Sequence, residues 1–372
     1  MDKVIFDLQE LYQKGIGNSL IKKDIIDTLK PYFENLNELE SNFTSSPLLS
    51  AYEYIKKYSE DEVFVKGLTD VLMYYRNALE TDKDATIKVL LAKVDEFLES
   101  ENKMWSIRNE KNEFDHQLHI ELDIYDSVIK VFQITGSLLE INVRNIISEL
   151  YGMSLIINNK EIDYQKICQN KFGTTIKLLL ETGNLEEVLK IQPHDIKLSD
   201  WRNIAVHGSY YIENNQEIVM VWGEGVNKNT IKMNYEEFII HFYQIMRSSN
   251  ILNIARCLFV VDNLALLKED SPAKLFKQKF RDDMLFNQIK ISLASEGFRV
   301  MNIYADDIGL KMEIQDVQRN NYNKNYIAKR ETVLAQLFGA RASGFPTGRI
   351  DIEYYSSEGE IIDIFWISLT YK

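Results

Sequence analysis

The hydrophobic positions of the N-terminal third recur at helical spacing. Between residues 2 and 101, apolar side chains follow one another at intervals of three and four residues, as on one face of an α-helix. Turn-forming residues interrupt this pattern at 15–17, 31, 42–47 and 80–84. The pattern predicts a region of several helices without a recognisable functional site.

The segment from residue 111 to residue 270 is also predicted to be mainly helical. An apolar stripe indicates a long amphipathic helix from Asp123 to Tyr151, with Gly152 at its end. Further helices are expected over residues 164–181 with Gly183 beyond the end, over 185–190, between Ser199 and Gly208, and from Tyr235 to about Leu267.

Residues with known capping preferences mark two of these helices. Ser199 is suited to be an N-cap, because its hydroxyl can accept a hydrogen bond from a backbone N–H group. Gly208 is suited to a left-handed helix end. Asn234 is expected to cap the last helix, which carries Glu237 in its first turn.

Short strands are predicted in two places. Residues 210–212 and 217–222 flank a polar turn and indicate a β-hairpin inserted among the helices. After Pro272 the pattern changes, and helices are expected at 281–293 and 326–338, with strands at 299–304, 310–314, 349–355 and 361–368. This last part therefore reads as a small α/β domain.

Length and composition fit a multidomain globular protein. A chain of 372 residues exceeds the usual size of one domain, and we expect three regions, over residues 1–110, 111–270 and 271–372. The net charge of −13 argues against general binding of duplex nucleic acid. The two cysteines suggest neither a disulfide framework nor a thiolate metal site. No apolar run is long enough to span a bilayer, so a cytoplasmic location without membrane attachment is expected.

The segment from Ser199 to Tyr210 concentrates chemically useful side chains. It reads Ser-Asp-Trp-Arg-Asn-Ile-Ala-Val-His-Gly-Ser-Tyr, which places Arg202, Asn203 and His207 in two helical turns. An arginine can hold two phosphate oxygens, and a histidine titrates near neutral pH and can transfer protons. RNA supplies its own nucleophile, the 2′-hydroxyl. This set is therefore suited to cutting a phosphodiester without a metal.

The segment resembles the signature of the HEPN superfamily (higher eukaryotes and prokaryotes nucleotide-binding), in which an arginine, four to six residues and a histidine mark a helical ribonuclease domain. Arg202, the polar Asn203 and His207 match that signature. Upstream, residues 138–147 are similar to the first family helix and residues 172–180 to the helix that precedes the motif. The resemblance ends before about residue 110 and beyond about residue 270. It implies a mainly α fold, namely a HEPN-like helical bundle with a hairpin insertion.

The resemblance also implies an activity. HEPN ribonucleases generally dimerise so that two motifs meet across a two-fold axis, which implies a homodimer with a composite active site, an RNA substrate, products ending in 2′,3′-cyclic phosphate, and neither metal nor cofactor. Arg202, Asn203 and His207 are the catalytic candidates. By analogy, an abortive-infection or toxin effector in anti-phage defence is expected, with a trigger or antitoxin protein as a further partner. The alternative is a catalytically silent HEPN module for dimerisation or regulation.

Other residues admit two interpretations. Glu140 and Arg144 stand four residues apart, and either form a surface ion pair or support the site from the first family helix. Tyr210, just after the motif, is a further supporting candidate. His116 and His119 lie near acidic residues and are interpreted as an exposed polar face, not a metal site.

Overall fold

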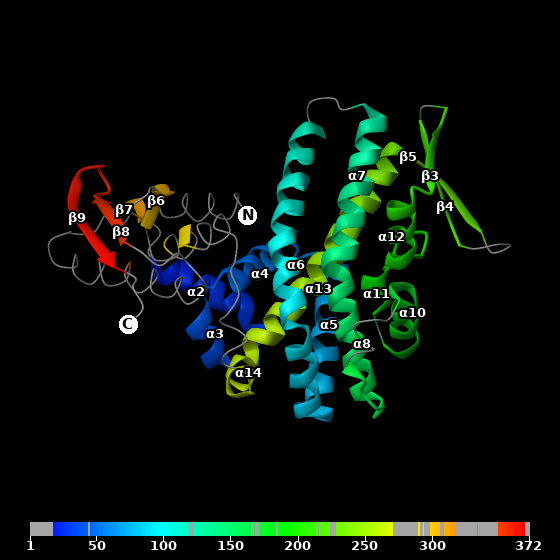
Figure 1. Ribbon diagram of the computed structural model, residues 1–372, viewed down its shortest axis with the longest axis horizontal. Coiled ribbons are helices and arrows are strands. Elements are labelled where there is room, and N and C mark those ends of the chain that lie inside the picture. Colours follow the sequence, from blue (N-terminus) through cyan, green and yellow to red (C-terminus); the bar gives the residue numbers. More distant parts are fainter. Residues whose placement is uncertain are drawn as a thin grey trace. The chain divides into compact units, whose positions relative to one another are not determined.

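The computed structural model shows a mainly helical chain with small sheets (Figure 1). It describes residues 18–43, 45–118, 123–164, 167, 171–183, 185–214, 216–223, 228–270, 289–290, 293, 298–305, 309–316, 333 and 349–368. The chain forms two compact units, Tyr58–Val260 and Met1–Lys57 with Val261–Lys372. Each unit is described by itself below. No helix among the described residues is long and apolar enough to cross a membrane.

The unit from Tyr58 to Val260 is built from helices and carries the motif. Its helices are α5 (Glu62–Thr81), α6 (Lys83–Leu118), α7 (Ile124–Leu138), η2 (Leu139–Val143), α8 (Arg144–Ile157), α10 (Phe172–Thr182), α11 (Glu186–Leu189), α12 (Leu198–His207) and most of α13 (Tyr235–Asp262). Helices α5, α6 and α10 pack on α8, and α12 packs on α7. Figure 1 shows α7 and α8 as one long rod with α12 beside it.

Helix α13 supplies the centre of this unit. Aromatic rings along it contact three other helices: Phe238 meets Phe132 of α7, Phe242 meets Phe114 of α6, and Phe259 stacks on Tyr75 of α5 at 5.0 Å between centroids. Burial of large apolar side chains is the main favourable term in folding, so α13 joins the helices that hold the motif to those upstream.

A buried polar group also ties α13 to its neighbours. The Nε of Arg256 donates to both carboxylate oxygens of Glu149 on α8, at 3.0 and 3.1 Å. The hydroxyl of Tyr75 on α5 donates to Glu149 Oε1 at 2.7 Å. The guanidinium of Arg256 also lies 3.5 Å from the ring centroid of Phe97. Each of these two charged side chains, which are only 6% and 1% exposed, thus has a partner of opposite charge.

The helix expected to end at Gly152 continues instead to Ile157, and that expectation was wrong. A Cβ atom at residue 152 would lie only 2.8 Å from Cγ1 of Val89 on α6. Gly152 therefore serves the close approach of α6 and α8 rather than a helix end. Residue 110, where the sequence analysis placed a boundary, lies inside α6, which runs to Leu118.

The caps of α12 and α13 agree with the sequence at three of four positions. Gly208 ends α12 with φ of 63°, and its N–H donates to the carbonyl of Ile204. Asn234 and Glu237 exchange hydrogen bonds at 2.9 and 3.0 Å at the start of α13. Ser199 is not the N-cap, because α12 begins one residue before it. Strand β2 (Ile196–Lys197) runs directly into the helix, so Ser199 is buried in its first turn.

The predicted hairpin is present and has a third strand. Strands β3 (Tyr210–Glu213) and β4 (Glu217–Trp222) pair antiparallel, as expected. Strand β5 (Asn229–Asn234), which the sequence analysis did not predict, pairs with β4. Strand β2 also pairs with β1 (Lys190–Ile191) in a short ladder that was not predicted. The β3–β5 sheet leads from the end of α12 directly into α13.

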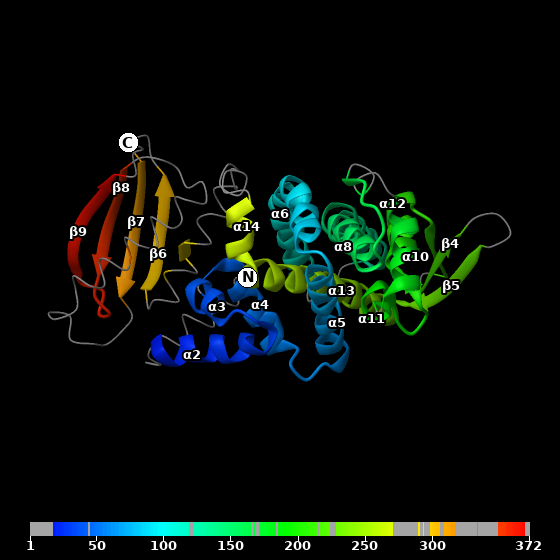
Figure 2. The ribbon, with the colours of Figure 1, turned by 90° about the horizontal axis from the view of Figure 1, so that it is seen from below.

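The second unit combines helices with a four-stranded sheet. Its elements include α2 (Asn18–Leu29), η1 (Lys30–Tyr32), α3 (Leu36–Asn42), α4 (Ser46–Lys57), α14 (Leu264–Asp270), β6 (Phe298–Ala305), β7 (Gly309–Asp316), β8 (Arg349–Tyr355) and β9 (Ile361–Ser368). The strands lie in sequence order, with β7 and β8 parallel and the other pairs antiparallel (Figure 2). The four predicted strands are confirmed. Most residues of the two predicted helices lie outside the described residues.

Candidate functional site

The motif helix α12 runs antiparallel to α7 and η2. Three pairs of neighbouring residues show this alignment: Arg202 with Glu140, Ala205 with Gly136, where an added Cβ would lie 3.5 Å from that of Ala205, and Tyr210 with Phe132. From one pair to the next, the residue number rises on the motif side and falls on the side of α7 and η2. The motif therefore lies beside the turn that carries the supporting candidate Glu140.

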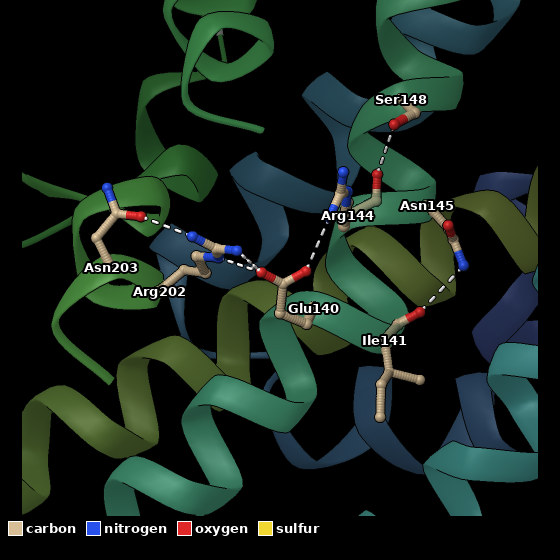
Figure 3. Close-up of polar contacts among 7 residues, drawn as sticks. All are labelled: Glu140, Ile141, Arg144, Asn145, Ser148, Arg202 and Asn203. Atoms are coloured by element: carbon tan, nitrogen blue, oxygen red, sulfur yellow. Dashed lines mark hydrogen bonds and ion pairs between the residues drawn. The ribbon is translucent and has the colours of Figure 1, made fainter. Parts of the chain in front are cut away.

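Glu140 joins the two halves of the candidate site. Its Oε1 accepts a hydrogen bond from Nε of Arg202, 62 residues further along the chain, and forms an ion pair with Nη2 of the same guanidinium. Its Oε2 accepts from Nη1 of Arg144 at 3.0 Å. Figure 3 shows the carboxylate between the two arginines. Of the two interpretations of Glu140 and Arg144, the ion pair is present, and it also contacts the motif arginine.

A local irregularity of the helix lies at this carboxylate. Residues Leu139–Val143 form a turn of π-helix between α7 and α8, and Glu140 is its second residue. Such turns contain one residue more than a regular α-helical turn, and they are frequent at functional sites. The turn therefore sets the direction of Glu140 relative to both helices.

Asn203 contacts Arg202 and is exposed. Its Oδ1 accepts from Nη1 of Arg202 at 3.0 Å. The described contact thus places its amide oxygen on the arginine, and Figure 3 shows Asn203 at the outer end of the cluster.

His207 is exposed in the last turn of α12. It follows Arg202 by five residues, about 140° around the helix axis at 3.6 residues per turn. None of the described contacts joins His207 to Arg202, whose guanidinium is held by Glu140. Within one chain, the cation and the base of the motif therefore lie on different faces.

Tyr210 lies just beyond the C-terminal end of the motif helix and packs on α7. Its ring stacks on Phe132 of α7 with 3.9 Å between centroids, and burial raises the pKa of its hydroxyl. The contact fixes the start of β3 against α7. The geometry thus gives Tyr210 a role in positioning the end of α12.

A second histidine, which the sequence analysis did not single out, packs behind the motif. His241 of α13 is buried, and its ring lies 5.9 Å from that of Trp201 and 5.4 Å from that of His194. Its Nδ1 is 2.7 Å from the carbonyl oxygen of Glu237. Burial, and then the nearby His194, lower the pKa of His241. An apolar helical stripe containing one histidine was the signal available in the sequence.

The free energy of unfolding is expected to decrease as the pH is lowered, because of His241. Its pKa in the folded chain lies below the ordinary value of 6.5, so the unfolded chain binds more protons as the solution is acidified. The free energy of unfolding contributed by the neutral ring is complete above pH 6.5 and is lost as the pH falls through the folded-state pKa. Urea denaturation between pH 7.5 and pH 5 (about neutral to mildly acidic) measures this.

His241→Phe should remove part of that pH dependence, because it removes the titrating ring. His116→Gln, at an exposed position in α6, is the matched control and should leave the dependence unchanged. An identical pH dependence in His241→Phe and in the unmodified protein would show that other groups cause it.

Among the described residues, no group of three or more histidine, cysteine, aspartate or glutamate side chains is arranged to hold a metal ion. His119 lies outside the described residues. The expectation that the site works without a metal remains a prediction. Comparisons of this chain with family models, with curated proteins and with solved structures found no match.

Proposed function

We propose that this protein is a metal-independent endoribonuclease of the HEPN type. The observation that carries the proposal is the cluster around Arg202. Glu140 is joined by hydrogen bonds to Arg144 and to Arg202, which in turn contacts Asn203, and the exposed His207 lies in the last turn of the same helix as Arg202. The cluster combines two guanidinium groups with one carboxylate, so a net positive charge remains for a phosphate.

The chemistry would use the 2′-hydroxyl of RNA as nucleophile. A histidine takes the proton of the 2′-hydroxyl as the 2′-oxygen attacks phosphorus, and the bond from phosphorus to the 5′-oxygen breaks. The leaving 5′-oxygen takes a proton from a second acid, which leaves a 2′,3′-cyclic phosphate and a 5′-hydroxyl. Arg202 would stabilise the charge that develops on the phosphoryl oxygens, while Glu140 holds its guanidinium in place.

The faces of α12 favour a site made by two chains. His207 of one chain cannot supply both base and acid, and it lies on a different face of α12 from its own Arg202. A two-fold axis near α12 would place His207 of each chain beside the other motif. Val206 and Tyr211, which flank the end of α12, are 46% and 53% exposed. These exposed apolar side chains favour contact with a second copy of the chain at this end of the helix.

Cleavage of RNA by the purified protein is expected to persist in EDTA, because neither the nucleophile nor the proposed acid and base requires a metal. The same sequence made as DNA should not be cut, because it lacks the 2′-hydroxyl. Mapping the cut ends checks the mechanism, with a 2′,3′-cyclic phosphate expected. Strict dependence on magnesium, or cleavage of the deoxy substrate, would contradict the proposal.

A two-fold dimer is expected at assay concentration, which light scattering measures. Mixing unmodified chains with an excess of His207→Ala chains provides a sharper test. If one composite site uses His207 from both chains, each mixed dimer lacks one of the two histidines and should be as inactive as the His207→Ala dimer. An active monomer, or mixed dimers that keep substantial activity, would contradict the composite site.

The proposed cellular role is that of an abortive-infection or toxin effector that cuts RNA during anti-phage defence, with a trigger or antitoxin protein as partner. The support for this role is the resemblance of the motif to HEPN effectors. Production of the protein in a bacterium should then arrest growth, and His207→Ala should relieve the arrest.

One observation favours the alternative of a silent HEPN module. Arg202 is already paired with Glu140, so a phosphate must compete with a carboxylate for it. A silent module predicts that the purified protein binds its partner or dimerises equally well with and without His207. Growth arrest that is unaffected by His207→Ala would support this alternative.

A further inference from the structure

A hollow of about 720 Å³ lies on the helical unit, away from the motif. Its walls come from α5, α11, the C-terminal end of α8 and the C-terminal end of α10. Its volume is in the range of roughly 300 to 1,000 Å³ that is typical of sites for small molecules. Neither the Glu140 cluster nor α12 contributes a residue to it.

The charged residues of this hollow are mostly acidic. Four carboxylates line it, accompanied by a single lysine: Asp70, Glu181, Glu186, Glu187 and Lys66. Apolar side chains of Met73, Ile157 and Leu180 lie between them. This lining is complementary to a molecule that combines positive charge with aliphatic segments.

Three of the carboxylates have lysine neighbours at the surface: Glu187 with Lys66 at 2.8 Å, Glu186 with Lys190 at 2.8 Å, and Glu181 with Lys177 at 3.9 Å. Exposed ion pairs of this kind contribute little to stability. A ligand that carries several positive charges can therefore displace the lysines without a large loss of folding stability.

Asp70 and Tyr74 supply the second and independent observation. They stand one turn apart on α5, both line the hollow, and Tyr74 is only 8% exposed. Oδ2 of Asp70 and the hydroxyl of Tyr74 are buried and have no hydrogen-bond partner among the described residues. Burial, together with the nearby Glu187, raises the pKa of Asp70 against the opposite effect of Lys66. Unpaired buried polar groups are costly, and a ligand that donates hydrogen bonds would offset that cost.

The spacing of the carboxylates selects the kind of cation. Within the part of the chain that the structure describes, no three acidic side chains converge as the ligands of one metal ion would. The negative charges are instead spread along the hollow. We propose that this hollow binds a linear aliphatic polyamine, whose ammonium groups pair with Asp70 and the three glutamates and whose methylene groups contact the apolar side chains. This site is separate from the proposed ribonuclease function and does not depend on it.

The test is binding of spermidine to the purified full-length chain, measured by equilibrium dialysis at an ionic strength of about 0.15 M, where diffuse surface attraction is largely screened. One saturable site per chain is expected. Asp70→Asn should lower the association constant about ten-fold or more, equivalent to about 1.4 kcal/mol. Glu99→Gln, which removes the same charge at an exposed position of α6 outside the hollow, should leave it unchanged.

Tyr74→Phe separates a binding role from a structural one. It keeps the ring, which packs so closely on Gly183 that a Cβ there would lie 2.8 Å from Cε2, and it removes only the unpaired hydroxyl. We expect weaker spermidine binding, by about three-fold or more, and a thermal unfolding midpoint that is not lowered. Absence of saturable binding would overturn the proposal. So would equal losses in Asp70→Asn and Glu99→Gln, or magnesium displacing spermidine at an equal concentration.

Discussion

Replacing Arg202 by alanine is expected to lower the rate of RNA cleavage by about 10²- to 10³-fold, the usual cost of removing a group that stabilises transition-state charge. His207→Ala is expected to lower it by about 10²- to 10⁴-fold, because proton transfer is lost. Asn203→Ala should be intermediate, since its amide only contacts the arginine. Single-turnover cleavage of a labelled RNA measures all three.

The chain offers a closely matched control for Arg202. Arg247 pairs with Asp61 through Nη1 at 2.9 Å, and the two side chains are 24% and 26% exposed. The corresponding values for Arg202 and Glu140 are 24% and 25%. Arg247→Ala therefore removes a similar ion pair from the same unit and should leave cleavage unchanged. Full activity in Arg202→Ala or His207→Ala, with unchanged thermal unfolding, would refute the site assignment.

The second large effect concerns stability. Glu149→Ala is expected to reduce the free energy of unfolding by about 3 to 5 kcal/mol, because it leaves the guanidinium of Arg256 buried without a counter-charge. Arg256 and Glu149 are only 6% and 1% exposed, and the hydroxyl of Tyr75 would also lose its acceptor. Urea denaturation followed by circular dichroism measures the change.

Glu99→Ala is the control for this prediction. Glu99 pairs with Lys103 on α6, and the two side chains are 68% and 53% exposed. Removing such a surface pair should leave the free energy of unfolding almost unchanged. If Glu149→Ala and Glu99→Ala reduced the free energy of unfolding by the same small amount, the buried ion pair would not be a main source of stability. The link between α8 and α13 would then have to come from apolar packing alone.

Much of the local structure could be predicted because it depends on neighbouring residues. Gly208 ends α12 through a left-handed backbone, and Asn234 with Glu237 forms the cap of α13. The strands of the second unit follow from their alternating patterns, which the buried face of the sheet reflects. Each of these features is determined within a few residues of sequence, and the periodicity rules act on that scale.

The features that could not be predicted depend on contacts between distant residues. Gly152 has the character of a helix end in sequence, and only the nearness of Val89 explains why it lies inside α8. The ion pair of Glu140 with Arg144 follows from their spacing, whereas the contact with Arg202 requires α12 to lie along α7. The buried Glu149 had no local signal, because its partners come from α5 and α13.

The π-helical turn at Leu139–Val143 has a consequence for insertions and deletions. Each residue advances an α-helix by about 100°, so loss of one residue from this turn would rotate all of α8 relative to α7. Glu149 would then leave the core, or Glu140 would leave Arg202. Any related chain that has a regular helix here must therefore differ by a one-residue gap, and an ungapped alignment would compare the wrong faces of α8.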